Sequence, residues 1–97
     1  MEIVRSKNGV PIRLAGERWT HIVENHDDLA GRLDDILDAV ESPAWITRGQ
    51  AGSLIAWRPL RRGRFLSVIY RELGKAEGFI VTAFITTKPR KEGTVWP

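Results

Sequence analysis

The sequence has no cysteine, only two histidines and no long apolar run. Without cysteine there is no disulfide, no thiolate nucleophile and no zinc cluster of the cysteine type, which fits a reducing compartment. The start, residues 1–7, carries charges where a signal peptide has its apolar core, and no run approaches the roughly 18 apolar residues that span a bilayer. We therefore expect a cytoplasmic protein without a membrane partner.

Several catalytic motifs are also missing. There is no Gly-x-x-x-x-Gly-Lys-Ser/Thr loop, no Gly-x-Ser-x-Gly elbow and no His-Glu-x-x-His. These absences weigh against P-loop nucleotide hydrolysis, serine hydrolase triads and zinc proteolysis. A metal would have to be held by His21 with Glu17 or Glu24, which supplies only two or three ligands. We expect neither a metal nor a cofactor.

What the sequence does contain is an uneven distribution of charge beneath its net charge of +3. Residues 1–44 carry five Lys/Arg against nine Asp/Glu, a balance of −4, and residues 45–97 carry ten against three, a balance of +7. Cations interleaved with aromatic side chains are suited to a phosphate backbone. The predicted nucleic-acid contacts are Arg48, Arg61, Arg62, Arg64, Lys88 and Arg90. A solvated basic surface, or one that docks on an acidic partner, is the alternative.

The length of 97 residues predicts a single domain that begins with a short arm and a helical layer. In residues 1–13, Asn8-Gly9 is a strong turn signal, so we expect a hairpin or an extended arm. Residues 14–43 have apolar side chains at helical spacing in two segments. The second helix is expected to start at Asp27-Asp28 as its cap and to end before Pro43.

Residues 44–87 change to the pattern of strands. Four runs, 45–48, 53–59, 64–72 and 79–87, are separated by short glycine-containing loops, which predicts an antiparallel meander. In the last run we expect Phe79, Val81, Ala83 and Ile85 to face the helices, and Ile80, Thr82, Phe84 and Thr86 to line an open face. The period of the third run does not decide which of its faces is inside.

Residues 88–97 form a basic segment with two prolines, which we expect to be an irregular tail. The predicted fold class is therefore α+β, with two N-terminal helices packed on one face of a four-stranded antiparallel meander.

The two histidines lie on the first predicted helix and are the best acid/base candidates. At about 100° per residue, His26 falls about 20° from Trp19 on the apolar stripe, and His21 about 200° round, beside Glu17 and Glu24. His21 is thus the first candidate and His26 the second. A hydrogen-bonded structural role for His26, and an idle surface position for His21, are the alternatives.

The other candidate catalytic residues come from the strands. Metal-independent RNA cleavage needs a general base, a general acid and a cation that offsets the charge of the phosphorane. Arg58 and Arg71 could provide the cation, and Tyr70, Thr82 and Thr86 could donate hydrogen bonds to the phosphate. Each of these residue types also occurs in sheets for structural reasons alone.

Two stretches carry a family resemblance: Arg18-Trp-x-His21-Ile-x-x-x-His26, followed by a Leu/Ile-rich helix, and Phe79-Ile-Val-Thr-Ala-Phe-Ile-Thr86. Together they resemble the phage-associated and toxin-like branch of the barnase–EndoU–colicin–RelE nuclease superfamily, from about Ile12 to the end of the chain. Asp27 departs from the pattern, because similar sequences have proline there.

The resemblance implies a helical layer on one face of a four-stranded antiparallel sheet, with RNA bound and cut on the opposite face or its rim, usually without metal. It implies His21 and His26, a sheet arginine such as Arg58 or Arg71, and Thr82 and Thr86 as functional positions. We therefore expect a small toxin-type or phage-derived endoribonuclease, with RNA as substrate and a cognate inhibitor protein as a candidate partner. The alternative is a non-catalytic RNA- or protein-binding module on the same fold.

Overall fold

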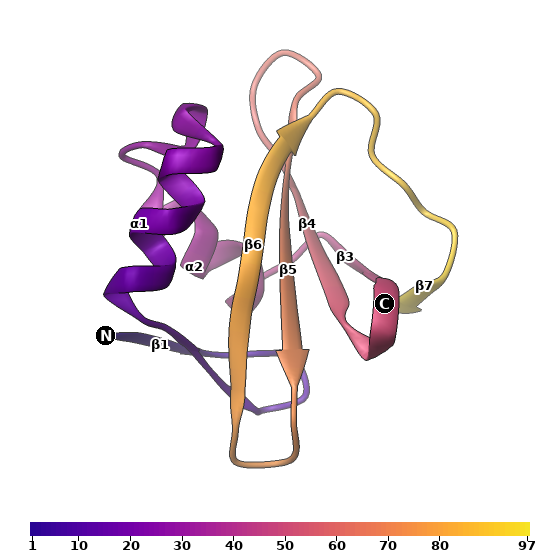
Figure 1. The fold of residues 1–97 in the computed structure, drawn as a ribbon. Helices are drawn as coiled ribbons and strands as arrows, with labels where there is room; N and C mark the ends of the chain where they lie inside the picture. Colours follow the sequence, from indigo (N-terminus) through magenta and orange to yellow (C-terminus); the bar gives the residue numbers. More distant parts are fainter.

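The computed structural model describes residues 1–97 as two α-helices and one seven-stranded sheet (Figure 1). The helices are α1 (Gly16–Asn25) and α2 (Leu33–Glu41), with 3₁₀ turns at Asp27–Leu29 and Gln50–Gly52. The strands are β1 (Glu2–Arg5), β2 (Pro11–Leu14), β3 (Trp45–Arg48), β4 (Leu54–Pro59), β5 (Phe65–Glu72), β6 (Gly78–Thr86) and β7 (Thr94–Trp96). The α+β class expected from the sequence is confirmed.

The sheet is larger than expected and mixed. Its order is β1-β2-β6-β5-β4-β3-β7. Successive strands from β3 to β6 pair antiparallel, but the prediction of a four-stranded, purely antiparallel sheet is wrong. The N-terminal hairpin joins the sheet because β2 pairs parallel with β6, and the tail joins it because β7 pairs with β3. Both additions depend on pairing between segments far apart in sequence.

A glycine permits the parallel junction between β2 and β6. Gly78 lies opposite Ile12 in the register. A Cβ at position 78 would lie 2.5 Å from Cδ1 of Ile12 and 2.6 Å from the carbonyl oxygen of Arg71. Because these distances are shorter than carbon and oxygen atoms tolerate, only glycine lets the strands approach in this way.

The two prolines predicted an irregular tail, but part of the tail forms a strand. It crosses the end of the sheet and returns beside β3 as the short edge strand β7 (Figure 1). The backbone N–H of Arg48 donates to the carbonyl of Gly93, and the indole N–H of Trp45 donates to the carbonyl of Arg90, both at 2.9 Å. The tail is therefore bound to the sheet at two points before β7 ends.

The second helix begins later than the sequence indicated. Asp27–Leu29 forms only a 3₁₀ turn, and Gly31 adopts a φ of +79°, so α2 starts at Leu33 rather than at Asp27. The helix ends at Glu41, two residues before Pro43, as expected from the restriction that proline places on the preceding residue.

The register determines which side chains of β5 and β6 face the helices. Leu66, Val68 and Tyr70 of β5 are fully buried toward the helices, which settles the face that the alternation left open. A bulge in β6 changes the predicted alternation, since Ile69 pairs with Thr82 and Tyr70 with Ile80. Ile80 therefore faces the core with Ala83, whereas Val81 lines the cleft of the opposite face and Phe79 pairs with Arg71. The expected faces of Phe79, Ile80 and Val81 are wrong.

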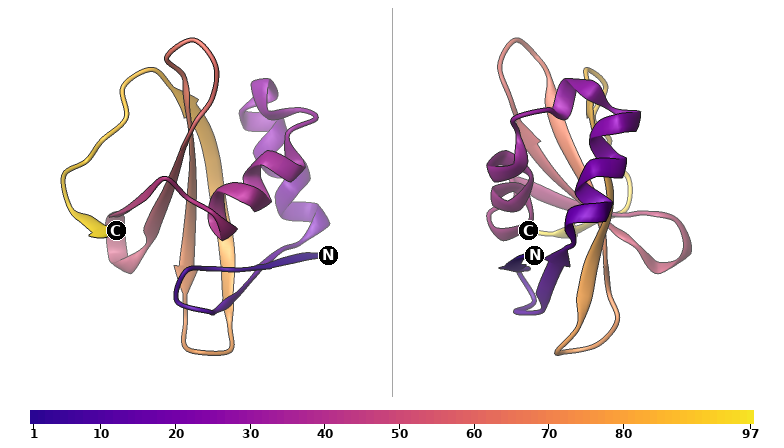
Figure 2. Two further views of the ribbon diagram at one scale, coloured as in Figure 1. Left: turned by 180° about the vertical axis from the view of Figure 1, so that it is seen from behind. Right: turned by 60° about the vertical axis from the view of Figure 1, so that its left-hand side comes forward.

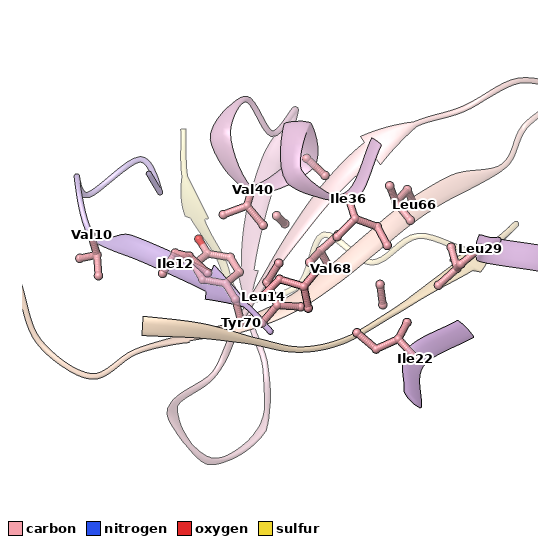
Figure 3. Close-up of a cluster of buried hydrophobic side chains, with 14 residues drawn as sticks. Val10, Ile12, Leu14, Ile22, Leu29, Ile36, Val40, Leu66, Val68 and Tyr70 are labelled. Atoms are coloured by element: carbon pink, nitrogen blue, oxygen red, sulfur yellow. The ribbon is translucent and has the colours of Figure 1, made fainter. Parts of the chain in front are cut away.

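The main core lies between the helical layer and the face of the sheet that it covers (Figures 2 and 3). The hairpin contributes Val10, Ile12 and Leu14, and the helical layer contributes Ile22, Leu29, Ile36, Ala39 and Val40. The opposite, helix-free face carries a smaller cluster of Trp45, Ile55 and Trp57, with Phe65 and Ile69 packed against it. The sheet thus has a covered face and a face open to a ligand.

Candidate nucleic-acid interface

The helix-free face contains a cleft of about 620 Å³, which we call the arginine cleft. Three arginines contribute to its walls: Arg48 at the end of β3, Arg71 near the end of β5 and Arg90 in the tail. Its apolar floor consists of Ile55, Ile69, Val81 and Phe84. The cleft therefore combines positive charge with apolar area on the face that the helices leave uncovered.

The loop between β3 and β4 forms one wall of this cleft. The N–H of Gly49 donates to the carbonyl of Ser53, and the Ser53 N–H and hydroxyl both donate to the carbonyl of Gln50. Ala51 at the tip adopts a left-handed φ of 53°, and its carbonyl accepts a hydrogen bond from the Arg71 guanidinium. This contact holds the Arg71 side chain toward the loop while other N–H groups of the fork stay available.

The tail supplies the third arginine of the cleft. The hydrogen bond from Trp45 to the Arg90 carbonyl fixes the backbone there, and the Lys91 ammonium lies 4.6 Å from the Trp45 ring centroid. A cation over an indole ring is favourable because the ring face carries negative potential. Arg90 is therefore placed at the cleft by tertiary contacts of the tail and not by a strand.

Aromatic packing stiffens the sheet beside the cleft. Trp45 and Trp57 stack with their ring centroids 5.8 Å apart and their planes inclined by 7°. Trp57 also meets Phe84 edge to face, and its indole N–H donates to the Thr47 hydroxyl at 2.9 Å. Both tryptophans are buried, so they pack the sheet and do not offer a ring face for stacking on a base.

The electrostatics of the arginine cleft favour an anion. None of its lining residues is acidic. The two ion pairs of the protein, Arg13 with Glu77 and Arg32 with Asp35, lie elsewhere. The guanidinium charges of the cleft are therefore not neutralised by a carboxylate, and a phosphate entering it would meet no acidic side chain on its walls.

Two of the predicted catalytic residues lie on the covered face. Arg58 is a register neighbour of the core residue Leu66. Its guanidinium donates to the carbonyl of Ser42, which directly follows α2. The Tyr70 side chain is fully buried beside Ile12, and its hydroxyl has no hydrogen-bond partner (Figure 3). Burial, and next the Glu72 carboxylate, raises the pKa of Tyr70 far above that of an ordinary tyrosine. Neither side chain reaches the arginine cleft.

The two histidines lie on the helical side of the molecule. His21 is exposed on α1 and lines a shallow hollow of about 470 Å³ with Ala15, Glu17 and Arg18. His26 caps the C-terminal end of α1, where its backbone N–H donates to the carbonyl of Ile22 at 2.8 Å. Neither histidine lines the arginine cleft. The expectation that both histidines lie on one helix is wrong, because α1 ends at Asn25 and His26 follows it with a non-helical φ of −139°.

The two threonines lie on β6, and neither lines the arginine cleft. Thr82 pairs with Ile69 and shares its helix-free face. Thr86, at the end of the strand, accepts a hydrogen bond on its hydroxyl from the Lys88 N–H at 3.1 Å. Of the seven residues predicted to be catalytic, only Arg71 lines the arginine cleft, so the structure does not bring the set together at one phosphate.

Five of the six predicted nucleic-acid contacts divide into two groups. Arg48 and Arg90 line the arginine cleft, whereas Arg61, Arg62 and Arg64 surround a separate open hollow of about 860 Å³ near Arg32 and Asp35. Lys88 is exposed at the start of the tail.

Sequence reasoning missed the β3–β4 loop and the floor residues Val81 and Ile69 as parts of a site. The only signal for the loop was its pair of glycines, which indicates a turn and not a wall of a cleft.

No group of three or more His, Cys, Asp or Glu side chains lies close enough together to hold a metal ion. No helix has both the length and the apolar character needed to cross a bilayer.

Comparisons of the chain with protein-family models, with curated proteins and with solved structures find no match. The arginine cleft and the residues that carry the resemblance are therefore the features that point to a function.

Proposed function

We propose that this protein is a small ribonuclease-type domain that binds single-stranded RNA in the arginine cleft. The observation that carries the proposal is the convergence of Arg48, Arg71 and Arg90, without a carboxylate, on an apolar floor. Arginine binds phosphate oxygens through a planar fork, and the apolar floor offers contact area to a base or ribose. An unpaired strand exposes both groups at once, whereas a duplex hides its bases.

The position of the cleft agrees with the resemblance stated above. That superfamily binds RNA on the sheet face opposite the helices or on its rim, and the arginine cleft lies on the helix-free face. The choice of RNA over DNA rests on this resemblance, and a comparison of the two polymers tests it directly.

A binding experiment tests the proposal. Fluorescence anisotropy with a labelled single-stranded RNA should show binding that weakens with salt, because each phosphate contact releases counterions. We expect Arg71→Ala to weaken binding about tenfold, the loss of one charge-assisted contact. Lys75→Ala is the matched control, since Lys75 is exposed in the β5–β6 connection and lines neither wall nor floor of the cleft. Equal affinity of Arg71→Ala and wild type, or equal affinity for DNA of the same sequence, would contradict the proposal.

Cleavage of the bound RNA by metal-independent transesterification is the second part of the proposal. Three arginine forks around one cleft favour it, because they hold the strand in a fixed position. In this assignment Arg48, Arg71 and Arg90 anchor the RNA, and the phosphate that is cut lies outside the cleft, at a histidine. His21 remains the first candidate for proton transfer, and His26 the second. The non-catalytic module is the alternative, favoured by the absence of both histidines from the cleft.

Incubation with labelled RNA in EDTA separates cleavage from binding. We expect wild type to cut without metal, and Arg71→Ala to cut more slowly. His21→Ala and His26→Ala report which histidine transfers a proton. If wild type binds RNA and leaves it intact, the protein is the binding module and the catalytic assignment fails.

A further inference from the structure

A second hollow adjoins the arginine cleft across the sheet. Arg13 of β2 and Phe79 of β6 are register neighbours, and Phe79 is in turn the neighbour of Arg71 on β5. Paired residues on adjacent strands point to the same side, and neighbouring strands lie about 4.8 Å apart. The row Arg71, Phe79 and Arg13 therefore crosses three strands and leads from the cleft toward α1.

This hollow has a volume of about 240 Å³ and is lined by Arg13, Ala15, Arg18, Phe79 and Ile80. It shares Ala15 and Arg18 with the hollow beside His21. We call the two together the edge groove. The arginine cleft and the edge groove are thus successive depressions, linked by the pairing of Arg71 with Phe79.

The edge groove, like the cleft, combines guanidinium groups with apolar area. Arg13 and Arg18 supply two guanidinium groups, and Phe79 supplies a half-buried aromatic ring. The Arg13 guanidinium carbon lies 5.9 Å from the Phe79 ring centroid. Aromatic rings between cations form the kind of surface on which single strands stack their bases and place their phosphates.

The groove also contains acidic groups. Glu17 lies in the hollow of His21, and Glu77 contacts Arg13 at 3.6 Å. The side chains of that ion pair are 41% and 57% exposed, so water screens their attraction. Arg13 can therefore exchange Glu77 for a phosphate at little cost.

We propose that the edge groove is a second RNA subsite, which takes the nucleotides next to those in the arginine cleft and leads the strand to His21. This inference rests on the proposed function. Phe79 stacks on a base, and Arg13 and Arg18 contact the flanking phosphates. The path gives His21 an access to RNA that the arginine cleft alone does not provide.

Oligonucleotide length distinguishes the two sites. A short RNA of about 4 nucleotides fills the cleft, and one of about 12 nucleotides also reaches the edge groove, within the range of small single-strand binding folds. We expect the double variant Arg13→Ala/Arg18→Ala to weaken binding of the longer RNA about tenfold and to leave the shorter one unchanged. Its salt slope should fall by about 1.4, at roughly 0.7 per phosphate contact.

The stacking role has its own variant. Phe79→Leu keeps an apolar side chain but removes the aromatic ring, and it should weaken binding of the longer RNA about fivefold or more. Lys75→Ala again serves as the control, because it removes one positive charge outside the groove.

The failures of the two proposals differ. If the double variant weakens both RNAs equally, or neither, the edge groove is not a separate subsite, whereas the cleft proposal stands as long as Arg71→Ala weakens both. If Arg71→Ala changes neither RNA, the arginine cleft itself fails. If the double variant loses binding to a folded acidic protein but keeps its affinity for RNA, the groove binds a protein partner and the inference is overturned.

Discussion

The two faces of the central sheet show how the same strands can serve stability on one side and binding on the other. Toward the helices, Leu66, Val68 and Tyr70 of β5 are completely buried. On the opposite side the same strand presents Phe65, Ser67, Ile69 and Arg71, of which the last two line the arginine cleft. Alternation of side chains places a dry core and a charged cleft within one strand.

The helix-free face is itself divided. At one end of the β3–β4 pair it is closed by the stacked Trp45 and Trp57, and at the other end, beside the β3–β4 loop, it opens into the cleft. Stability and binding therefore meet on this face at Phe84, which contacts Trp57 and also lines the cleft floor. Substitutions on the two faces should separate these contributions.

The largest effect is expected at the buried tryptophan of the helix-free face. Trp57→Ala removes a side chain that is 1% exposed, together with its contacts to Trp45 and Phe84. Truncation of a buried tryptophan lowers the free energy of unfolding by about 3–5 kcal/mol. Urea denaturation measures the change. A loss below about 1 kcal/mol would mean that this face contributes little to the core.

On the covered face, Leu66→Ala should cost about 2–5 kcal/mol, because Leu66 is fully buried in the main core. The expected signature is a lower urea midpoint with unchanged RNA affinity of the folded fraction. If the Leu66→Ala variant binds RNA more weakly under conditions in which it is fully folded, the two faces are coupled.

A matched pair of arginines compares the faces directly. Arg48→Ala removes a cation of the arginine cleft, so we expect about tenfold weaker RNA binding and unchanged stability. Arg58→Ala removes the hydrogen bond to the Ser42 carbonyl behind the sheet, so we expect a loss of about 1 kcal/mol of stability and unchanged binding. Fluorescence anisotropy measures the RNA affinity of each variant, and urea denaturation measures its free energy of unfolding. The reverse pattern would place the RNA on the helical side.

The smallest effect concerns the buried hydroxyl of Tyr70. Because this hydroxyl has no partner, Tyr70→Phe should raise the free energy of unfolding at neutral pH by about 1 kcal/mol. A decrease of that size would show that the hydroxyl makes a stabilising contact.

The same residue gives a pH dependence with a defined sign. Burial raises the pKa of Tyr70 in the folded state, whereas the unfolded residue ionises near pH 10. The folded state keeps the proton that the unfolded state releases, so the stability due to this residue is complete below about pH 10 and declines above it. Tyr70→Phe should lack this part of the alkaline decline. Urea midpoints of both proteins at neutral and alkaline pH provide the comparison.

Local signals in the sequence located most elements but not their assembly. The Asn8-Gly9 turn, the helix ending before Pro43 and the four runs from β3 to β6 all depend on residues within a few positions of one another. The parallel pairing of β2 with β6 and the pairing of β7 with β3 depend on residues distant along the chain. No period within a segment encodes such a pairing.

The residues of the candidate site were predicted only in part, because their assembly also depends on long-range pairing. The charge of the C-terminal half indicated Arg48 and Arg90 as nucleic-acid contacts, and residue chemistry indicated Arg71. The bulge in β6 and the faces of Arg58 and Tyr70 determine which side chains can meet. The face on which a side chain lies depends on the register of its strand, because a shift of one residue moves each side chain to the opposite face.

By itself the sequence determined the α+β composition, the positions of the four strands from β3 to β6 and the concentration of positive charge in the second half, because each follows from residue identity or local spacing. Only the tertiary structure decided that the hairpin and the tail extend the sheet, that three arginines from a strand end, a second strand and the tail share one cleft, and that the histidines lie away from it. The physical reason is that long-range pairing and side-chain burial are collective properties, in which each residue's position depends on partners that its neighbours in sequence do not specify.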